Sequence, residues 1–188
     1  MKFETERLIL RKWLIEDAEN LYKVAKEKKV ARPCGWKEHE SIGESKEIIE
    51  NLFKKNPYAF AVCLKKNNIA IGCIEIILSE NSRLEVLKDI KSKKDLELGC
   101  WIGKEFWGQG LMYEAMQELI KFSFENLGAD KIYCSYTDGN IKSKRLQEKC
   151  GFTYFLTEEK RLYRILNEIR KAHVNVLTKE SWRKNENC

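Results

Sequence analysis

The sequence predicts a single α/β domain built around a mixed sheet, and three observations support this prediction. The 188 residues, of which 43% are hydrophobic and 11% aromatic, can bury a sizeable core. Short apolar runs typical of strands alternate with segments whose apolar residues recur at helical spacing. The sequence contains no repeat, low-complexity tract or linker, so residues 1–188 are expected to form one domain.

Seven apolar runs have the length and composition of β-strands, and turn-forming or charged residues bound each of them. In chain order they cover residues 7–11, 58–64, 69–78, 96–102, 131–136, 152–157 and 173–177. Only the polar turn Lys65-Lys-Asn-Asn68 separates the second run from the third, so these two are expected to form a β-hairpin. The charged stretch 160–171 fits a strand or a helix equally well.

Four segments carry apolar side chains at the spacing of an amphipathic helix. In chain order they cover residues 16–28, 45–55, 110–127 and 141–149. Ser45 is expected to cap the second helix, and Gly128 is expected to end the third. The stretch 32–44, with Pro33 and two glycines, predicts a loop. The polar excursion 79–95 is long for a connection, and it is either a substrate lid or a variable surface loop.

Charge and cysteine content argue against several function classes. The net charge of +6 arises from 35 basic and 29 acidic residues, which indicates a mixed, solvated surface and argues against a nucleic-acid partner. The seven cysteines form no Cys-x-x-Cys pair, and neither histidine lies near a cysteine, so no metal site is expected. No signal peptide and no apolar run of about 18 residues is present. We therefore expect a cytoplasmic protein with reduced thiols and no membrane partner.

The segment 104–115 predicts a phosphate-binding site. Gly108 and Gly110 lie between an apolar strand and an amphipathic helix. The first amides of a helix lack partners within it and favour an anion, and glycines let a phosphate approach the main chain. No Gly-Lys-Ser/Thr triplet follows, and Tyr113 stands where a dinucleotide fingerprint needs a third glycine. The two common nucleotide motifs are therefore excluded.

These residues resemble the signature Arg/Gln-x-x-Gly-x-Gly/Ala of the GNAT superfamily of acyl-CoA-dependent N-acetyltransferases. Here the register is Trp107-Gly-Gln-Gly-Leu-Met112, so Trp107 and Met112 depart from the signature. The run Leu96–Gly103 is similar to the fourth strand of that family. Asn140-Ile-Lys-Ser143, followed by Glu148-Lys-Cys-Gly-Phe152, is similar to its Asn-x-x-Ser…Glu-Lys-x-Gly-Phe block.

Both ends of the chain resemble one branch of this family. Glu4-Thr-Glu-Arg-Leu-Ile-Leu-Arg11 and Leu177-Thr-Lys-Glu-Ser-Trp182 are similar to the branch that acetylates ribosomal-protein N-termini. The resemblance implies a central, mostly antiparallel twisted sheet that splays after its fourth strand, with about four flanking helices. It also implies an acetyltransferase that moves an acetyl group directly from acetyl-CoA to a primary amine, without a metal. The acceptor would be a protein N-terminus or a small molecule, and a homodimer would be common for such a protein.

The resemblance assigns acetyl-CoA contacts to the fourth strand, the glycine loop and the Asn-x-x-Ser block. The residues concerned are Cys100, Trp101, Ile102, Trp107, Gly108, Gln109, Gly110, Leu111, Met112, Asn140 and Ser143. Because Trp107 offers no cation or amide to a pyrophosphate, the loop is expected to bind mainly through its backbone. Lys104 could supply a nearby positive charge.

The reaction needs a group that removes a proton from the acceptor amine and a donor for the departing thiolate. Glu97 is the first candidate base and Glu75 the second, because each is an isolated carboxylate in an apolar strand; a water chain or a solvent-facing Glu97 are the alternatives. Ser143 is the candidate thiolate donor, since Gln147 stands where many relatives carry a tyrosine. Ser143 could equally be a helix cap or a plain cofactor contact.

Trp36 and His39 lie where this fold forms part of its acceptor site, although a lone loop histidine is more often exposed. Two further function classes stay open. The tryptophan at position 107 and the glutamine at position 147 would suit a catalytically silent acyl-CoA sensor, and the basic charge would suit an RNA- or ribosome-associated module. The sequence does not name the acceptor.

Overall fold

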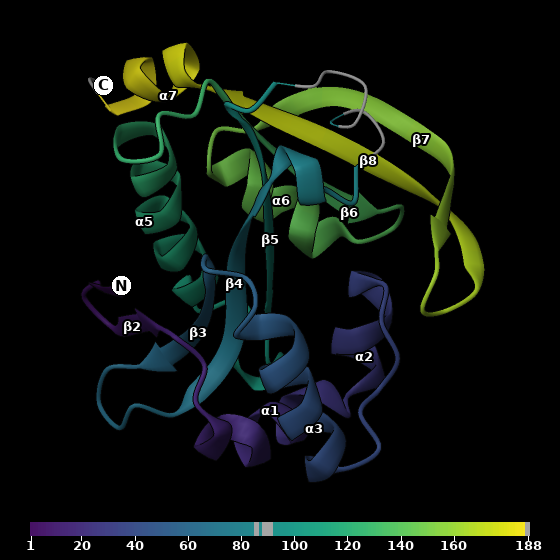
Figure 1. Cartoon of the computed structure of the whole chain (residues 1–188). Coiled ribbons are helices and arrows are strands. Elements are labelled where there is room, and N and C mark those ends of the chain that lie inside the picture. Colours follow the sequence, from purple (N-terminus) through teal and green to yellow (C-terminus); the bar gives the residue numbers. More distant parts are fainter. Residues whose placement is uncertain (85–86, 88–91, 187–188) are drawn as a thin grey trace. The chain divides into compact units, whose positions relative to one another are not determined.

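The computed structural model describes residues 1–84, 87 and 92–186 (Figure 1). The chain forms two compact units. Unit 1 comprises Met1–Glu75, Cys100–Ala115 and Tyr163–Asn167, and unit 2 comprises Ile76–Gly99, Met116–Leu162 and Glu168–Cys188. Strands β4 and β5 and helix α5 pass from one unit into the other and cover Ala70–Leu78, Asp95–Ile102 and Leu111–Glu125. The last residue of β7, Tyr163, also belongs to unit 1.

The sheet of unit 1 follows the chain order β1-β2-β3-β4-β5. Its first three strands cover Lys2–Glu4, Leu8–Arg11 and Ala59–Leu64. Each of the pairs β1–β2, β2–β3 and β3–β4 is antiparallel, and Leu10 lies opposite Val62. The predicted strand over residues 7–11 and the predicted hairpin are therefore confirmed.

Six helical segments of unit 1 lie between β2 and β3 in the chain, and Figure 1 shows α1, α2 and α3 close together. They cover Ile15–Asp17 (η1), Ala18–Ala25 (α1), Lys28–Ala31 (α2), Arg32–Cys34 (η2), Ile42–Ile48 (α3) and Ile49–Phe53 (η3). The prediction that Ser45 caps the second helix is wrong. Ser41 is the cap, because its hydroxyl accepts the Glu44 amide at 3.1 Å, and Ser45 is fully buried one turn later. The pattern Ser41-x-x-Glu44 carried this signal.

Aromatic side chains form the core of unit 1 around the last residues of β5. Trp13 stacks on Phe53 with ring centroids 4.8 Å apart, and Trp101 lies 6.2 Å from Trp13. Small residues of β3 and β4, such as Ala61 and Cys73, pack against this cluster. The cluster therefore fixes the position of Trp101 on β5 relative to the helices of unit 1.

Unit 2 contains the other half of the sheet, in the order β5-β6-β8-β7. Strands β6, β7 and β8 cover Lys131–Thr137, Thr153–Tyr163 and Glu168–Thr178, and helices α6 and α7 cover Ile141–Lys149 and Lys179–Glu186. The ambiguous stretch 160–171 is a strand–turn–strand segment, whose mostly exposed charged side chains concealed the strands. Helix α7 places Trp182 on Phe124 at 5.1 Å. Helix α6 has its predicted boundaries.

The sheet changes direction and then opens at β5. Strand β5 pairs with β6 in parallel, whereas β6 and β8 are antiparallel. The parallel ladder joins Asp95–Glu97 to Lys131–Tyr133, although β5 continues to Ile102 and β6 to Thr137. The expected fold class, a mostly antiparallel mixed sheet that splays after its fourth predicted strand, is confirmed.

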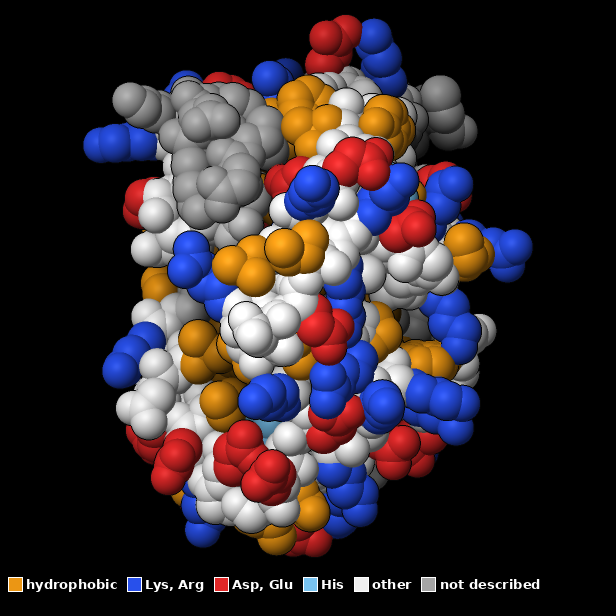
Figure 2. Space-filling view, turned by 90° about the vertical axis from the view of Figure 1, so that its right-hand side faces the viewer, with side chains coloured by type: hydrophobic (Ala, Val, Ile, Leu, Met, Phe, Trp, Pro, Cys, Tyr) orange, Lys and Arg blue, Asp and Glu red, His pale blue; other side chains and the backbone are white. Residues whose placement is uncertain are grey.

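Charged side chains of both signs cover the surface. Figure 2 shows Lys and Arg interspersed with Asp and Glu over the face it presents. Several of these charges form exposed i,i+4 ion pairs, such as Lys23 with Glu19 and Lys54 with Glu50. Within residues 1–84, 87 and 92–186, no helix is long and apolar enough to cross a membrane.

Gly72 of β4 lies so close to β5 that a side chain does not fit. A Cβ at this position would lie 2.4 Å from the Trp101 carbonyl oxygen and 3.0 Å from Ile102 Cα, both main-chain atoms. We expect Gly72→Ala to lower the free energy of unfolding by about 1–3 kcal/mol, measured by urea denaturation. Gly43→Ala is the control, since its nearest contact is an ordinary 3.5 Å and alanine favours the helix. Equal denaturation midpoints for Gly72→Ala and wild type would contradict this packing.

Candidate functional site

The glycine loop between β5 and α5 folds its own side chains back onto preceding backbone. After the short helix Lys104–Phe106, the indole Nε1–H of Trp107 donates to the Ile102 carbonyl at 3.0 Å. The side-chain amide of Gln109 donates to the Glu105 carbonyl at 2.8 Å. Trp107 and Gln109 therefore shape the loop through internal hydrogen bonds, which supports the expectation that a ligand meets mainly backbone.

The two glycines give this loop its path. Gly108 and Gly110 both have φ of 75°, a left-handed conformation that other residues adopt only at a cost of about 1–2 kcal/mol. A Cβ at Gly108 would meet nothing within 4 Å, so the main chain is open on that side. This open main chain would admit a phosphate group.

Helix α5 begins directly after Gly110 and presents its first amides there. The first hydrogen bond of the helix runs from the Glu114 amide to the Gly110 carbonyl at 3.1 Å, so the preceding amides have no acceptor within the helix. Leu111 and Met112 are buried as whole residues, so their apolar side chains offer no polar contact and only their amides could donate to a ligand. The helix dipole favours an anion at this end. The residues present therefore fit a diphosphate.

The last residues of β5 lead into the loop from the aromatic core of unit 1. Cys100 and Trp101 are half-buried and Ile102 is buried. Trp36 lies edge-on to Trp101 at 5.7 Å, so the predicted acceptor loop and this strand are in contact. Cys100–Ile102 and the glycine loop thus form one continuous candidate surface within unit 1.

His39 is buried rather than exposed. The residue is 8% exposed, and Nδ1 lies 2.8 Å from the Ser45 hydroxyl. Burial lowers the pKa of His39 from its ordinary value. The expectation of an exposed loop histidine is therefore wrong. The His39 ring packs inside the loop, and its centroid lies 5.5 Å from that of the Trp36 ring.

Asn140, Ser143 and Gln147 of unit 2 form a connected polar network. The Asn140 side chain caps α6 by accepting the Ser143 amide at 3.2 Å. The Gln147 side-chain amide donates to the Ser143 hydroxyl oxygen at 3.1 Å and to the Ser135 carbonyl at 3.2 Å, and its oxygen accepts from Asn175 at 3.0 Å. The Ser143 hydroxyl therefore accepts from Gln147, which leaves its own hydrogen to donate elsewhere.

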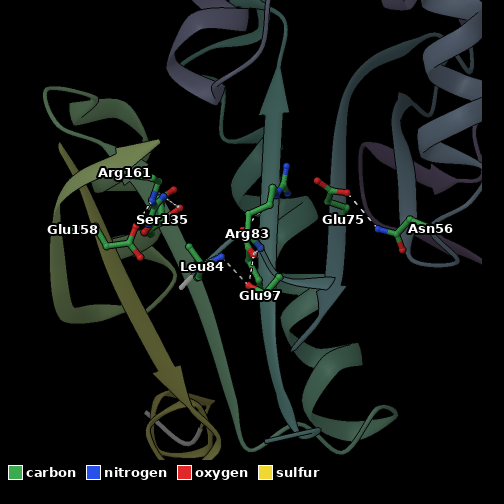
Figure 3. A network of polar contacts seen from close by, with 10 residues as sticks. Asn56, Glu75, Arg83, Leu84, Glu97, Ser135, Glu158 and Arg161 are labelled. Atoms are coloured by element: carbon green, nitrogen blue, oxygen red, sulfur yellow. Dashed lines mark hydrogen bonds and ion pairs between the residues drawn. The ribbon is translucent and has the colours of Figure 1, made fainter. Parts of the chain in front are cut away.

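Glu97 is a buried residue of unit 2, and its carboxylate contacts Ser82 and Arg83 (Figure 3). Its Oε2 accepts from the Ser82 hydroxyl at 2.7 Å and from the Arg83 amide at 2.9 Å, and Arg83 Nε lies 3.6 Å from Oε1. The side chain is 6% exposed, so the alternative of a solvent-facing Glu97 is wrong. These contacts tie the start of the long connection to β5.

Glu75 has a different environment in unit 1. It is half-buried, and its Oε2 accepts from the Asn56 side-chain amide at 3.3 Å, as Figure 3 shows. Glu75 follows Cys73 by two residues on β4, so both side chains point to the same face of the strand. Cys73 packs in the aromatic cluster with Trp101, and Glu75 therefore lies on the face of the candidate surface.

The charged stretch of β7 contributes a polar pair that the sequence did not single out. Arg161 donates to the Ser135 hydroxyl at 2.8 Å and forms an ion pair with Glu158 (Figure 3). Arg161 Nη2 and Glu158 Oε1 are buried and have no partner in the described part of the chain. Arg161 Nη2 can therefore donate a hydrogen bond to a polar group, and Glu158 Oε1 can accept one. The sequence of this charged stretch gave no indication that the Arg161–Glu158 pair would be buried.

Among the described cysteines, Cys63, Cys73 and Cys134 are buried in strands and Cys150 is buried at the end of α6. Burial raises the pKa of Cys63 to about 12 and that of Cys150 to about 12. Cys34 is exposed and Cys100 is half-buried. Within the described ranges, no group of three or more His, Cys, Asp and Glu side chains could hold a metal ion.

Comparisons with known proteins relate this chain to acetyltransferases. Residues 7–153 match the family model described as an acetyltransferase (GNAT) domain. The chain is 25% identical over 154 residues to an uncharacterised N-acetyltransferase, p20, of Bacillus licheniformis, which covers 79% of this chain and 80% of that protein.

Two further comparisons concern shorter or more distant relationships. Over 56 residues, 30% of this chain and 31% of the relative, the chain is 39% identical to YdaF of Bacillus subtilis, whose name includes the words ribosomal N-acetyltransferase. The fold is similar to that of spermidine N-acetyltransferase from Vibrio cholerae, solved with CoA and spermine. That similarity has a TM-score of 0.73 and 19% identity over 95% of this chain and 99% of that chain.

The network around Gln147 predicts a measurable contribution to stability. Gln147→Ala would leave the buried Asn175 amide and the Ser135 carbonyl without this partner, so we expect the free energy of unfolding to fall by about 1–3 kcal/mol. Ser143→Ala is the control, because Gln147 keeps its other two partners and the loss should stay below about 1 kcal/mol. Urea denaturation measures both values, and similar midpoints for the two variants would refute the network.

Proposed function

This chain belongs to the GNAT family of acetyltransferases and is an N-acetyltransferase. From that premise we propose that it moves an acetyl group directly from acetyl-CoA to a primary amine, on a protein N-terminus or a small molecule, and that residues 1–188 act as one domain. The single observation that carries the donor proposal is the glycine loop. Its left-handed backbone at Gly108 and Gly110, open at Gly108, leads into the first turn of α5, where an anion is favoured.

Acetyl-CoA supplies an acetyl group activated as a thioester. Amides from Gly108 to Met112 would hold the pyrophosphate, and the main chain of Cys100–Ile102 would bind the extended pantetheine as a strand binds its neighbour. Trp101 is held in place by the aromatic core, so this stretch of β5 is rigid before any ligand arrives. Rigid placement lowers the entropic cost of holding a reactive group.

The acceptor amine must lose a proton, because its ordinary pKa is about 10.4 for a lysine and about 8 for an N-terminus. Glu75 is the carboxylate that we propose to take this proton, directly or through water. It lies on the strand face that carries the aromatic cluster and Trp101, next to the acceptor loop with Trp36. Glu97 stays the other candidate, although Ser82 and Arg83 already occupy its oxygens.

Ser143 would hydrogen-bond to the sulfur that leaves. Gln147 fixes the Ser143 hydroxyl oxygen as an acceptor, so the hydroxyl hydrogen is available for another partner. A serine hydroxyl is a weak acid, and its contribution is a hydrogen bond to the developing negative charge rather than full proton transfer. In this arrangement Gln147 is a positioning residue that acts through Ser143.

A catalytically silent acyl-CoA sensor is the second candidate function. The observation that favours it is the Gln147 side chain, which stands at the position of the tyrosine of many relatives and whose oxygen and nitrogen both bond within unit 2. A sensor would bind CoA and transfer nothing. The experiments below separate the two functions.

The proposed donor site is tested with two glycine variants that share their backbone strain. Gly108 and Gly128 both have positive φ, and a Cβ at either would meet nothing within 4 Å. We expect each alanine variant to lose about 1–2 kcal/mol of stability, but only Gly108→Ala to weaken CoA binding, by tenfold or more. Calorimetric titration with CoA measures this difference.

The same proteins are assayed for free CoA released from acetyl-CoA over a panel of N-terminal peptides, polyamines and small amines. Transfer by wild type and Gly128→Ala, with weaker use of acetyl-CoA by Gly108→Ala, is the expected result. Equal CoA affinity in both glycine variants would contradict the loop assignment. Binding of CoA without transfer to any amine would favour the sensor.

The proposed proton acceptor, Glu75, and the proposed hydrogen-bond donor to the leaving sulfur, Ser143, are tested by substitution. We expect Glu75→Gln to lower kcat by at least tenfold, because a proton acceptor is lost, and Ser143→Ala to lower it by about tenfold. Glu97→Gln should act mainly on stability, since it disturbs the contacts with Ser82 and Arg83. Steady-state rates over a pH series, with CoA affinity as the control, give the answer. A larger fall of kcat in Glu97→Gln than in Glu75→Gln would reverse the assignment of the base.

A further inference from the structure

Arg7 contacts the glycine loop, although it lies 102 residues before Gln109 in the sequence. Its Nη1 donates to the Gln109 carbonyl at 2.9 Å, and its Nε donates to Glu114 Oε2 at 2.7 Å. The Arg7 amide also donates to Glu114 at 2.8 Å, and the Thr5 hydroxyl bonds the same carboxylate. All these residues belong to unit 1. The segment before β2 is thus fixed both to the loop and to the first turn of α5.

The signature residues from Trp107 to Met112 include no lysine or arginine, and the nearest preceding cation in the sequence is Lys104. The first signature position carries Trp107, whose indole N–H is used by the Ile102 carbonyl, and the Gln109 amide is used by the Glu105 carbonyl. A diphosphate bound only by main-chain amides would keep most of its charge uncompensated. A cation from elsewhere in the chain would correct this.

The Arg7 guanidinium has hydrogen-bond donors left for that purpose. Its Nε and Nη1 are used as described, whereas Nη2 has no partner among the described residues. Nη2 lies 3.5 Å from the place that a Cβ of Gly110 would occupy, so this nitrogen is next to the loop backbone. The Arg7 side chain is 45% exposed, which leaves Nη2 open to a ligand.

The contacts to Glu114 hold the guanidinium in one orientation. Burial alone would raise the pKa of the Glu114 carboxyl, but hydrogen bonds from Thr5 and Arg7 outweigh it and lower that pKa. The pair is therefore intact at neutral pH and is lost only as the pH falls through this lowered value. An arginine held in advance loses little conformational freedom when it binds a phosphate.

We propose that Nη2 of Arg7 binds the pyrophosphate of CoA at the glycine loop, as the cation that position 107 does not provide. This inference rests on the proposed function of the loop. It assigns a binding role to the first arginine of the N-terminal segment, 100 residues before the loop in the sequence. The guanidinium suits a phosphate because it donates several hydrogen bonds in one plane.

Calorimetric titration of CoA into wild type, Arg7→Gln, Arg7→Lys and the control Lys2→Gln tests the proposal over a series of salt concentrations. Lys2 lies in the same N-terminal segment and pairs with Glu4, so Lys2→Gln removes an equal charge away from the loop. We expect Arg7→Gln to weaken CoA binding by about tenfold and to reduce its salt dependence. Arg7→Lys should bind more weakly than wild type but keep the salt dependence, and Lys2→Gln should match wild type.

Other outcomes would overturn the inference in distinguishable ways. Equal weakening in both Arg7 variants with an unchanged salt dependence would mean that Arg7 only braces the loop. A loss that disappears with 3′-dephospho-CoA would assign Arg7 to the 3′-phosphate instead of the pyrophosphate. Unchanged CoA affinity in Arg7→Gln would remove Arg7 from the site while leaving the loop in place. Failure of wild type to bind CoA would overturn the proposed function together with this inference.

Discussion

The left-handed turn at Gly108 and Gly110 is the constraint on which the candidate donor site depends. Gly108 and Gly110, both with φ of 75° and separated by one residue, turn the chain from β5 into α5, whose first amides have no acceptor within the helix. Most side chains would strain this path, and a side chain at Gly108 would stand on its open face. The internal hydrogen bonds of Trp107 and Gln109 then hold the turn without using the amides that a phosphate needs.

Within unit 1, contacts between segments that are far apart in the sequence hold the glycine loop in one geometry. The Trp13–Phe53 stack fixes Trp101 on one side of β5, and the Thr5 and Arg7 contacts fix the start of α5. Neither contact lies within the loop itself. A loop supported in this way can bind through its main chain, because its main chain does not have to be ordered by the ligand.

Unit 2 shows how a departure from the family pattern can be accommodated. Gln147 occupies the position of an expected tyrosine and cannot act as an acid, but it is buried and bonds to Ser143, Ser135 and Asn175. In the proposed mechanism the hydrogen bond to the leaving sulfur therefore comes from the Ser143 hydroxyl. Glu97 illustrates the opposite outcome: an isolated acidic residue in a strand, which suggested a base, is engaged by Ser82 and Arg83.

Local patterns in the sequence determined the elements and the family: the strand alternation, the hairpin, the bounds of α6 and the glycine spacing all depend on neighbouring residues. The prediction of a Ser45 cap missed a local signal, since Ser41-x-x-Glu44 marks Ser41 as the cap while Ser45 is buried against His39. Only the tertiary structure decided the environments of Glu75 and Glu97, the burial of Arg161 and the position of Arg7 at the glycine loop. The physical reason is that burial and hydrogen bonding of a side chain are set by residues tens of positions away, which no local periodicity encodes.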